Sequence, residues 1–418
     1  MRIGFFTAVE GWGAETYLLS LMRGVRDAGH TPVLYDVDRT RLFREAAQAG
    51  IATVAWKVAS ADQRPQTRDH RPKTPESAEA AEPSRWPTYS GVKQAILRPV
   101  PGWIKLLAGN AREVFILRRV FGRNPVDVMH VSSSGHEVAG MACRLCRIPC
   151  LVMNMITPPA EPYWIRRWLM KFTMRFYDHI SSQSAACTRA WRSFAGVPTA
   201  KCSHVWNGVD MARFPSVSTA SRSSQDPFRL ISVGRLHPMK GFCDLIEAVR
   251  LLNDQRVRLV ILGEGPERGP LEKQISRAGL GERVTLPGHT ESPERYFREA
   301  DAFVLVSVSH ESCPAVVPEA MATGLPVITS DFGPLPEINV HGETGIVVPA
   351  GEPARLAEAI RHLIDHRDEA TRLGVNGRKR AVEYFSRERM VTTTLALYAS
   401  VVSRNRGNGR AQGCNTIR

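Results

Sequence analysis

The chain has 418 residues, which at about 150 residues per domain corresponds to two or three domains. Hydrophobic residues make up 43% and charged residues 23%, an ordinary globular usage that excludes fibrous, collagen-like and mainly disordered chains. Lysine and arginine together number 55 against 41 aspartate and glutamate residues, and the net charge of +14 favours anionic partners such as phosphorylated molecules, anionic lipid or nucleic acid.

Targeting signals and disulfides are not expected. The apolar run at residues 3–9 is too short for a secretory signal or a membrane span, so we expect a cytoplasmic protein. The eight cysteines are scattered along the chain and are expected to be reduced thiols. Cys143 and Cys146 form a CxxC pair, but no second pair with metal-ligand spacing accompanies them, which favours buried thiols over a zinc site.

The first 215 residues show the alternation of strands and helices that is typical of a parallel α/β sheet. An apolar run at 3–8 is followed by a glycine turn at 11–13 and by a helical pattern that ends at Gly29. A polar, proline-rich stretch at about 57–100 is interpreted as an insertion with little core to bury. The other strands expected in this part lie at 31–37, 126–131 and 150–155, and a helix is expected at 138–145.

A serine-rich stretch at 216–227 is predicted to link this domain to a second one at 228–385. Ligands of such domains bind at the carboxyl ends of the strands, and we expect them in the cleft between the halves. Residues 386–402 are predicted to form a helix that packs back on the N-terminal domain, and 403–418 a disordered tail. The strands predicted in the second domain lie at 230–233, 258–262, 284–286, 302–306 and 326–329.

Two cations lie on the loop that joins the first strand and helix of the second domain. Residues 234–241 read Gly-Arg-Leu-His-Pro-Met-Lys-Gly, with Arg235 and Lys240 five residues apart. Point charges and backbone donors beside a helix N-terminus suit a diphosphate. An exposed basic loop without a ligand is the alternative.

Two carboxylates lie eight residues apart around a helix start. Glu311 is expected on the loop after a strand, and Glu319 in a helix that begins near Ala315 and tolerates Pro318 in its first turn. Both side chains can face the cleft, where carboxylate oxygens accept hydrogen bonds from sugar hydroxyls. The alternative for Glu319 is a solvated glutamate stabilised by the helix dipole.

Six short motifs in a fixed order resemble the retaining glycosyltransferases of family 4, which have the GT-B fold of two Rossmann-like domains that face an interdomain cleft. The resemblance covers most of residues 1–402 outside the insertion. The motifs lie at 12–15 (Trp-Gly-Ala-Glu), 207–210 (Asn-Gly-Val-Asp), 233–241, 262–266 (Leu-Gly-Glu-Gly-Pro), 311–319 and 341–345 (His-Gly-Glu-Thr-Gly).

The resemblance implies a role for each matching residue. Arg235 and Lys240 would hold the donor diphosphate and stabilise the departing nucleoside diphosphate. Glu311 would face the donor sugar, and Glu319 would accept from the ribose hydroxyls. Backbone contacts to the donor are implied at Gly11, Gly13, Gly234, Gly263, Gly265, Ser312, Cys313, Ala315 and Val316, whereas Pro314 has no N–H to offer.

Histidines near the end of an N-terminal strand are candidates for contact with the donor sugar. His130 matches a position that family members often use, and a second such position falls on Ser132, with His136 a nearby substitute. A structural histidine is the alternative for both. The loop at 332–337 resembles the family pattern Gly-Gly-x-Pro-Glu with one glycine displaced.

No metal, cofactor or covalent nucleophile is expected. The resemblance implies that the acceptor attacks from the leaving-group face, so the paired-carboxylate logic of glycoside hydrolases does not apply. Asp36 and Asp38 spell Asp-x-Asp, but at an early strand end. The glycine turn at 11–13 lacks the third glycine of a dinucleotide fingerprint and the lysine of a P-loop.

Two basic and aromatic stretches, at 103–123 and 164–176, bear on the acceptor. Either could lie on an anionic membrane surface and meet a lipid-linked acceptor, and ordinary helix packing is the alternative. No nucleic-acid-binding module is present in the sequence.

The sequence therefore predicts a retaining glycosyltransferase that moves a sugar from a UDP- or GDP-sugar to a glycan or lipid-linked acceptor, in bacterial polysaccharide or glycolipid synthesis. It is expected in the cytoplasm or peripherally on the inner face of the plasma membrane. A nucleotide-sugar epimerase of the same fold and a non-catalytic nucleotide-sugar-binding protein are the alternatives.

Overall fold

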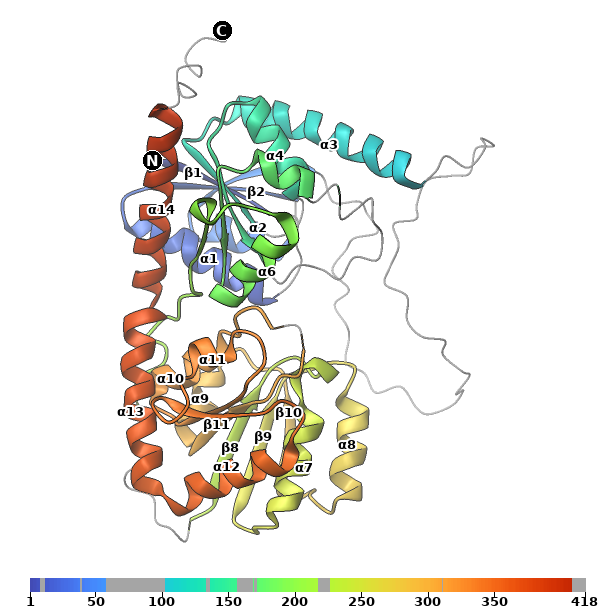
Figure 1. The fold of residues 1–418 in the computed structure, drawn as a ribbon, viewed down its shortest axis with the longest axis vertical. Coiled ribbons are helices and arrows are strands. Elements are labelled where there is room, and N and C mark those ends of the chain that lie inside the picture. The colour runs from blue at the N-terminus through green and yellow to red at the C-terminus, as the bar shows by residue number, and fades with distance from the viewer. Residues whose placement is uncertain are drawn as a thin grey trace.

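Two α/β units lie one above the other in the computed structural model, and helices α13 (Arg367–Tyr384) and α14 (Arg387–Gly407) run along one side of both (Figure 1). The structure describes residues 1–7, 12–37, 40–57, 102–132, 136–155, 168, 171–216, 226–309 and 311–407. Most of the predicted insertion, part of the predicted linker and residues 408–418 lie outside these ranges. Each unit is a parallel sheet with helices on both faces, which confirms the predicted fold class.

The N-terminal sheet has the strand order β3-β2-β1-β4-β5-β6-β7, and every pair is parallel. Its chain runs outward from β1 on one side and from β4 on the other, as in doubly wound folds. The strands are β1 (Arg2–Phe6), β2 (Thr31–Val37), β3 (Ala52–Lys57), β4 (Val128–Ser132), β5 (Cys150–Met155), β6 (His179–Ser182) and β7 (Cys202–His204).

Helices cover both faces of this sheet because each presents one apolar stripe. One core holds side chains of α1, including Leu18 and Met22, together with residues of α14. The other core holds side chains of α3, α4, the short helix η2 and α6. These elements are α1 (Trp12–Asp27), α2 (Arg41–Gln48), α3 (Gly102–Arg123), α4 (His136–Leu145), η2 (Met174–Phe176) and α6 (Ala185–Ala195).

The C-terminal sheet has the order β10-β9-β8-β11-β12-β13, so β8 and β11 are central neighbours. Its strands are β8 (Phe228–Val233), β9 (Val257–Leu262), β10 (Val284–Gly288), β11 (Ala302–Leu305), β12 (Val327–Ser330) and β13 (Gly345–Val348). Its helices are α7 (Phe242–Leu252), α8 (Arg268–Arg277), α9 (Pro293–Glu299), α10 (Val316–Thr323), α11 (Leu335–Ile338), α12 (Pro353–Asp365) and α13 (Arg367–Tyr384).

Helix α14 (Arg387–Gly407) packs back on α1 of the N-terminal unit. Met390, Val391 and Tyr398 are buried there, and a Cβ added at Gly24 of α1 would lie 2.3 Å from Val391 Cγ2. The helix runs five residues beyond the predicted end at 402, so the prediction that the tail starts at 403 is wrong. Asn405 explains the continuation, since it is buried and its amide donates to the Val401 carbonyl at 3.0 Å.

Within the described ranges, no helix combines the length and apolarity that crossing a membrane requires. The six cysteines whose side chains the structure describes are thiols and form no disulfide with one another.

Candidate functional site

The candidate site lies where the C-terminal sheet reverses its strand order. The chain leaves β8 toward β9 and leaves β11 toward β12, on the opposite side, so the loops after β8 and β11 diverge at their carboxyl ends. Open α/β sheets bind ligands at such a switch point. The loop at 234–241 follows β8, and the loop that carries Glu311 follows β11.

The loop after β8 is held in place by its own backbone. Residues Pro238–Lys240 form a short 3₁₀ helix that the His237 ring caps, accepting from the Met239 amide at 3.3 Å. Gly241 follows with a φ of 67°, and a Cβ there would lie 2.1 Å from the Val306 carbonyl oxygen. The Val308 amide also donates to the Met239 carbonyl at 2.9 Å. The two switch-point loops are therefore packed directly against each other.

An ion pair joins these two loops. Lys240 Nζ contacts Glu311 Oε1, and their side chains are only 14% and 6% exposed. Ser307 Oγ donates to the same carboxylate oxygen at 2.7 Å, and Ser330 Oγ donates to the Ser307 carbonyl at 2.6 Å. The structure thus brings together two of the predicted residues, and adds two serines at the ends of β11 and β12 that the sequence analysis missed. A polar residue directly after a buried strand is the signal that could have found them.

Arg235 lies on the same loop in a different environment. Its side chain is exposed, and in the part of the chain that the structure describes it forms no ion pair. It therefore adds an exposed positive charge to the loop that carries Lys240.

Two predicted glycines, Gly263 and Gly265, permit the close approach of the loops after β8 and β9. A Cβ at Gly263 would lie 1.9 Å from the Gly234 carbonyl oxygen, and φ of Gly263 is 144°. A Cβ at Gly265 would lie 2.1 Å from the Leu236 carbonyl oxygen. Backbone hydrogen bonds from Leu236 N to Glu264 O and from Glu267 N to Leu236 O, 3.0 and 3.1 Å long, close the contact. The close approach of these two loops therefore requires glycine at 263 and 265.

Glu319 lies in the first turn of α10, as predicted, with Ala315 as the N-cap residue. Its charged neighbours are Arg213 and Glu294, which form an ion pair at 3.0 Å. Burial raises the pKa of Glu319 to about 7. The carboxyl group is therefore poised between its neutral and ionised forms near neutral pH.

Residues 312 and 313 lie at the junction of the two units. Ser312 Oγ donates to Gln183 Oε1 at 3.3 Å, and Asn207 Nδ2 donates to the Cys313 carbonyl at 3.4 Å. Burial raises the pKa of the Cys313 thiol to about 12, so it stays protonated. Ala315 and Val316 follow at the start of α10 and are partly buried.

A second contact between the units involves Glu337 of α11. Its carboxylate accepts from the Ala185 amide at 2.9 Å and from Arg189 Nη2 at 2.8 Å, both on α6. A Cβ added at Gly333 would lie 3.5 Å from the Glu311 carbonyl oxygen. The segment from Gly333 to Glu337 therefore links the contact between the units to the backbone of Glu311.

The structure buries His130 inside the N-terminal unit, and its contact with the donor sugar stays a prediction. The ring is 1% exposed, its Nδ1 lies 2.8 Å from Tyr398 Oη of α14, and it packs on Phe5 at 5.3 Å. Burial lowers its pKa to about 3, so it is neutral. The physical reason is that α14 covers this part of β4.

The remaining N-terminal candidates are only partly described. Gly11 and the His136 side chain lie outside the described residues, while the backbone of Gly13 lies in the first turn of α1.

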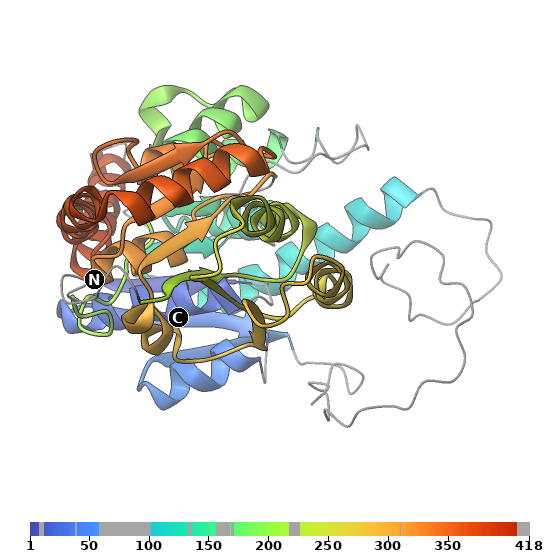
Figure 2. The same ribbon diagram turned by 90° about the horizontal axis from the view of Figure 1, so that it is seen from below.

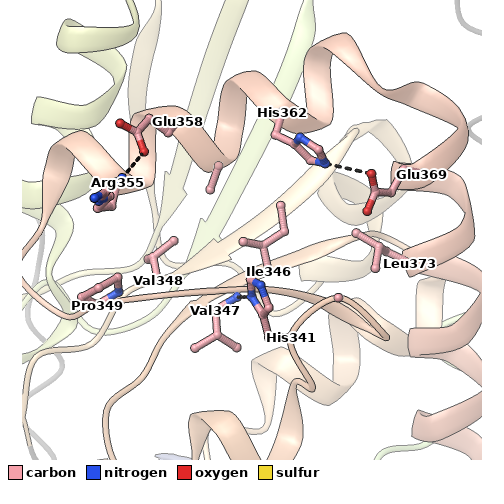
Figure 3. Close-up of a pocket in the computed structure, with 12 residues that line it drawn as sticks. His341, Ile346, Val347, Val348, Pro349, Arg355, Glu358, His362, Glu369 and Leu373 are labelled. Atoms are coloured by element: carbon pink, nitrogen blue, oxygen red, sulfur yellow. Dashed lines mark hydrogen bonds and ion pairs between the residues drawn. The ribbon is translucent and has the colours of Figure 1, made fainter.

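A pocket of about 420 Å³ lies elsewhere in the C-terminal unit, between β13 and the helices α12 and α13 (Figure 3). His362 Nε2 lies 2.8 Å from Glu369 Oε2 on its rim, and Ile346 and Leu373 line its interior. None of the predicted site residues is among those that line it, so it is separate from the switch point.

Two family models match adjacent parts of the chain. The model described as Glycosyltransferase Family 4 matches residues 12–213, and the model described as Glycosyl transferases group 1 matches residues 216–380. Together they account for both α/β units.

Curated relatives match over part of their length. A glycogen synthase of Mycobacterium tuberculosis is 29% identical over 65% of this chain and 62% of its own. A D-inositol 3-phosphate glycosyltransferase of Pseudarthrobacter chlorophenolicus is 36% identical over 48% and 50%, respectively. The chain thus spans about half to three fifths of the length of these relatives.

Solved structures share the whole fold. Anabaena Alr3699/HepE in complex with UDP has a TM-score of 0.75 at 19% identity, and the match covers 96% of this chain and all of that one. Sucrose-phosphate synthase from Thermosynechococcus elongatus has a TM-score of 0.69 at 18% identity, over 96% and 99%. With both units matched in sequence and the full architecture matched in structure, this chain belongs to the glycosyltransferases of family 4, the group 1 type with the GT-B fold.

Proposed function

We propose that the protein is a retaining glycosyltransferase that transfers a sugar from a nucleotide-sugar donor to a glycan or lipid-linked acceptor in bacterial polysaccharide or glycolipid synthesis. The observation that carries this proposal is the Lys240–Glu311 pair, which joins the two loops of the switch point. Family membership supports the reaction class. The solved relative Alr3699/HepE is in complex with UDP-glucose, and relatives named for lipopolysaccharide core and colanic acid biosynthesis support the type of acceptor.

Each side chain of the site has a role in this reaction. Arg235 and Lys240 bind the diphosphate, and Glu311 then exchanges its ion pair with Lys240 for hydrogen bonds from sugar hydroxyls. Glu319 accepts from the ribose hydroxyls. The glycines at 263 and 265 keep the loop after β9 beside this diphosphate site.

The chemical step needs only the donor, the acceptor and these groups. The bond between the anomeric carbon and the diphosphate oxygen breaks, and its electron pair leaves with the nucleoside diphosphate. The acceptor hydroxyl forms the new bond on the same face and gives its proton to the departing phosphate oxygen. Arg235 and Lys240 stabilise the negative charge that grows on that oxygen, which is where preorganised cations lower a barrier most. Retention of configuration follows from attack on the leaving-group face.

The first test is thermal unfolding of the full chain with UDP, GDP, ADP and their sugars, each with and without EDTA. A ligand that binds only the folded state raises the free energy of unfolding, by about 2.7 kcal/mol at 100 times its dissociation constant, and so raises the unfolding temperature. We expect one base to stabilise the protein, and the shift to survive EDTA. No shift with any nucleotide would overturn the donor assignment, and release of free sugar without an acceptor would favour an epimerase.

Donor affinity is expected to rise with pH through the pKa of Glu319, which burial raises to about 7. Below this pH the carboxyl group is neutral and can accept fewer hydrogen bonds from hydroxyl groups. Binding of a nucleotide sugar should therefore tighten by up to about tenfold from pH 6 to pH 8. Calorimetric titration across this range measures the effect. The matched variant Glu319→Gln removes the ionisation and should flatten the curve, and an unchanged slope in that variant would take Glu319 out of the ribose site.

A further inference from the structure

The N-terminal unit presents exposed cations and exposed apolar side chains on one layer of elements. We call this set the basic-aromatic surface. Its cations are Arg112, Arg118, Arg119, Arg123, Arg144, Arg147, Lys171 and Arg175, and its apolar members are Phe115, Leu145 and Trp168. All eleven side chains are exposed, and the acidic residues in the same described segments, 111–123, 144–147, 168 and 171–178, are Glu113 and Asp178.

Helix α3 supplies the central stripe of this surface. Arg112, Phe115, Arg119 and Arg123 recur at intervals of three or four residues and so share one face of the helix. The opposite face is buried in the core through Leu117 and its neighbours. Phe115 is 66% exposed in the middle of the basic stripe. Most of this phenylalanine side chain is therefore left uncovered by the described part of the chain.

The neighbouring elements continue the surface beyond α3. Cys146 Sγ donates to the Arg118 carbonyl at 3.4 Å, which places the end of α4, with Arg144 and Leu145, beside the C-terminal half of α3. Arg144 in turn lies 4.0 Å from Asp178, next to the segment that holds the remaining members. Because α3, α4 and η2 bury their inner faces in one core, their outer faces lie on the same side of the sheet and point away from it.

Aromatic stacking completes the surface near residue 168. The ring of Trp168 is 53% exposed and lies parallel to that of Phe172, with centroids 5.3 Å apart. Phe172 in turn meets Phe176 edge to face. Helix α3 projects from the molecule on the side opposite α14 (Figures 1 and 2).

We propose that the basic-aromatic surface docks on an anionic lipid bilayer, with the arginines at the headgroup phosphates and Phe115, Leu145 and Trp168 in the interfacial region. Charge complementarity favours a polyanion, and the exposed apolar side chains favour one with an apolar interior. A nucleic acid offers phosphates without that interior, so the bilayer is the better match. This inference deepens the proposed function, because such docking brings the enzyme to a lipid-linked acceptor, but lipid binding itself needs neither donor nor acceptor.

The test is cosedimentation of the full chain with vesicles of phosphatidylcholine alone or with 30% phosphatidylglycerol, at low and high salt. We expect binding to the anionic vesicles only, weakened by salt. Each basic side chain near such a surface contributes roughly a fivefold gain in partitioning, so Arg118→Gln/Arg119→Gln should bind about tenfold or more weakly. Phe115→Ser should also bind more weakly, because it removes the apolar contact.

The control variant Arg277→Gln/Arg295→Gln changes the net charge by the same amount, but on exposed residues of α8 and α9 in the other unit. It should bind like the wild type. Unfolding temperatures check that all variants are folded. Equal loss in the control and in the α3 variant would overturn the assignment of this surface. The proposal that the partner is a bilayer would be overturned if the protein did not bind anionic vesicles. It would also be overturned if the same arginines bound single-stranded RNA and the protein did not bind vesicles. Nucleotide stabilisation is measured without lipid, so either failure leaves the donor assignment separately testable.

Discussion

Replacing Lys240 by alanine is expected to lower turnover by about 10²-fold or more, the scale of removing one preorganised charge stabiliser. The structure adds a second expected effect. Glu311 is 6% exposed and loses its cation, retaining the hydrogen bond from Ser307, so the free energy of unfolding should fall by roughly 1–3 kcal/mol. Steady-state kinetics well below the unfolding temperature, together with urea denaturation, measure the two effects.

The two effects of the Lys240 substitution can be separated. In the double variant Lys240→Ala/Glu311→Gln no buried charge is left unpaired, so stability should recover while turnover stays low. Arg235→Ala should lose turnover on the same scale without losing stability, because its side chain is exposed. Lys273→Ala, an exposed lysine of α8, is the matched control and should keep turnover within about twofold. Turnover of a folded Lys240→Ala protein close to that of the wild type would contradict the diphosphate assignment.

Local sequence pattern was enough to predict the elements that carry the switch point, because each combines a buried strand with a glycine turn and an amphipathic helix. The loop at 234–241 and the helix that begins near Ala315 are where the pattern places them. Strand β6 was not predicted, since its residues His-Ile-Ser-Ser do not form an apolar run, yet all four are buried. Burial of β6 depends on neighbours that the local pattern does not contain.

The sequence also could not predict contacts between residues that are far apart in the chain. Lys240 and Glu311 are 71 residues apart, and each was predicted to contact a different part of the donor. Their ion pair shows that both groups are already neutralised by each other before a ligand arrives. His130 shows the reverse case, because its cover, Tyr398, lies 268 residues later in the chain. A histidine near a strand end therefore cannot be assigned to a ligand site before the packing of the C-terminal helix is known.

Replacing Gly265 by alanine is expected to lower the free energy of unfolding by roughly 2–4 kcal/mol and to abolish donor binding. The added Cβ would lie 2.1 Å from the Leu236 carbonyl oxygen, and the nearest atoms are all backbone, so no flexible side chain can move aside. The loops after β8 and β9 must then separate, which breaks the hydrogen bonds of Leu236 with Glu264 and Glu267. Urea denaturation and nucleotide-sugar titration measure the two losses.

Gly269 is the matched control, because it lies four residues away in the first turn of α8 and a Cβ there would meet nothing within 4 Å. Alanine costs a helix less backbone entropy than glycine, so Gly269→Ala should be as stable as the wild type or more stable by up to about 1 kcal/mol. Its donor affinity should not change. If Gly265→Ala behaved like Gly269→Ala, the close approach of the two loops would not be what holds the donor site together, and the motif at 262–266 would have to act through contacts with the nucleotide alone.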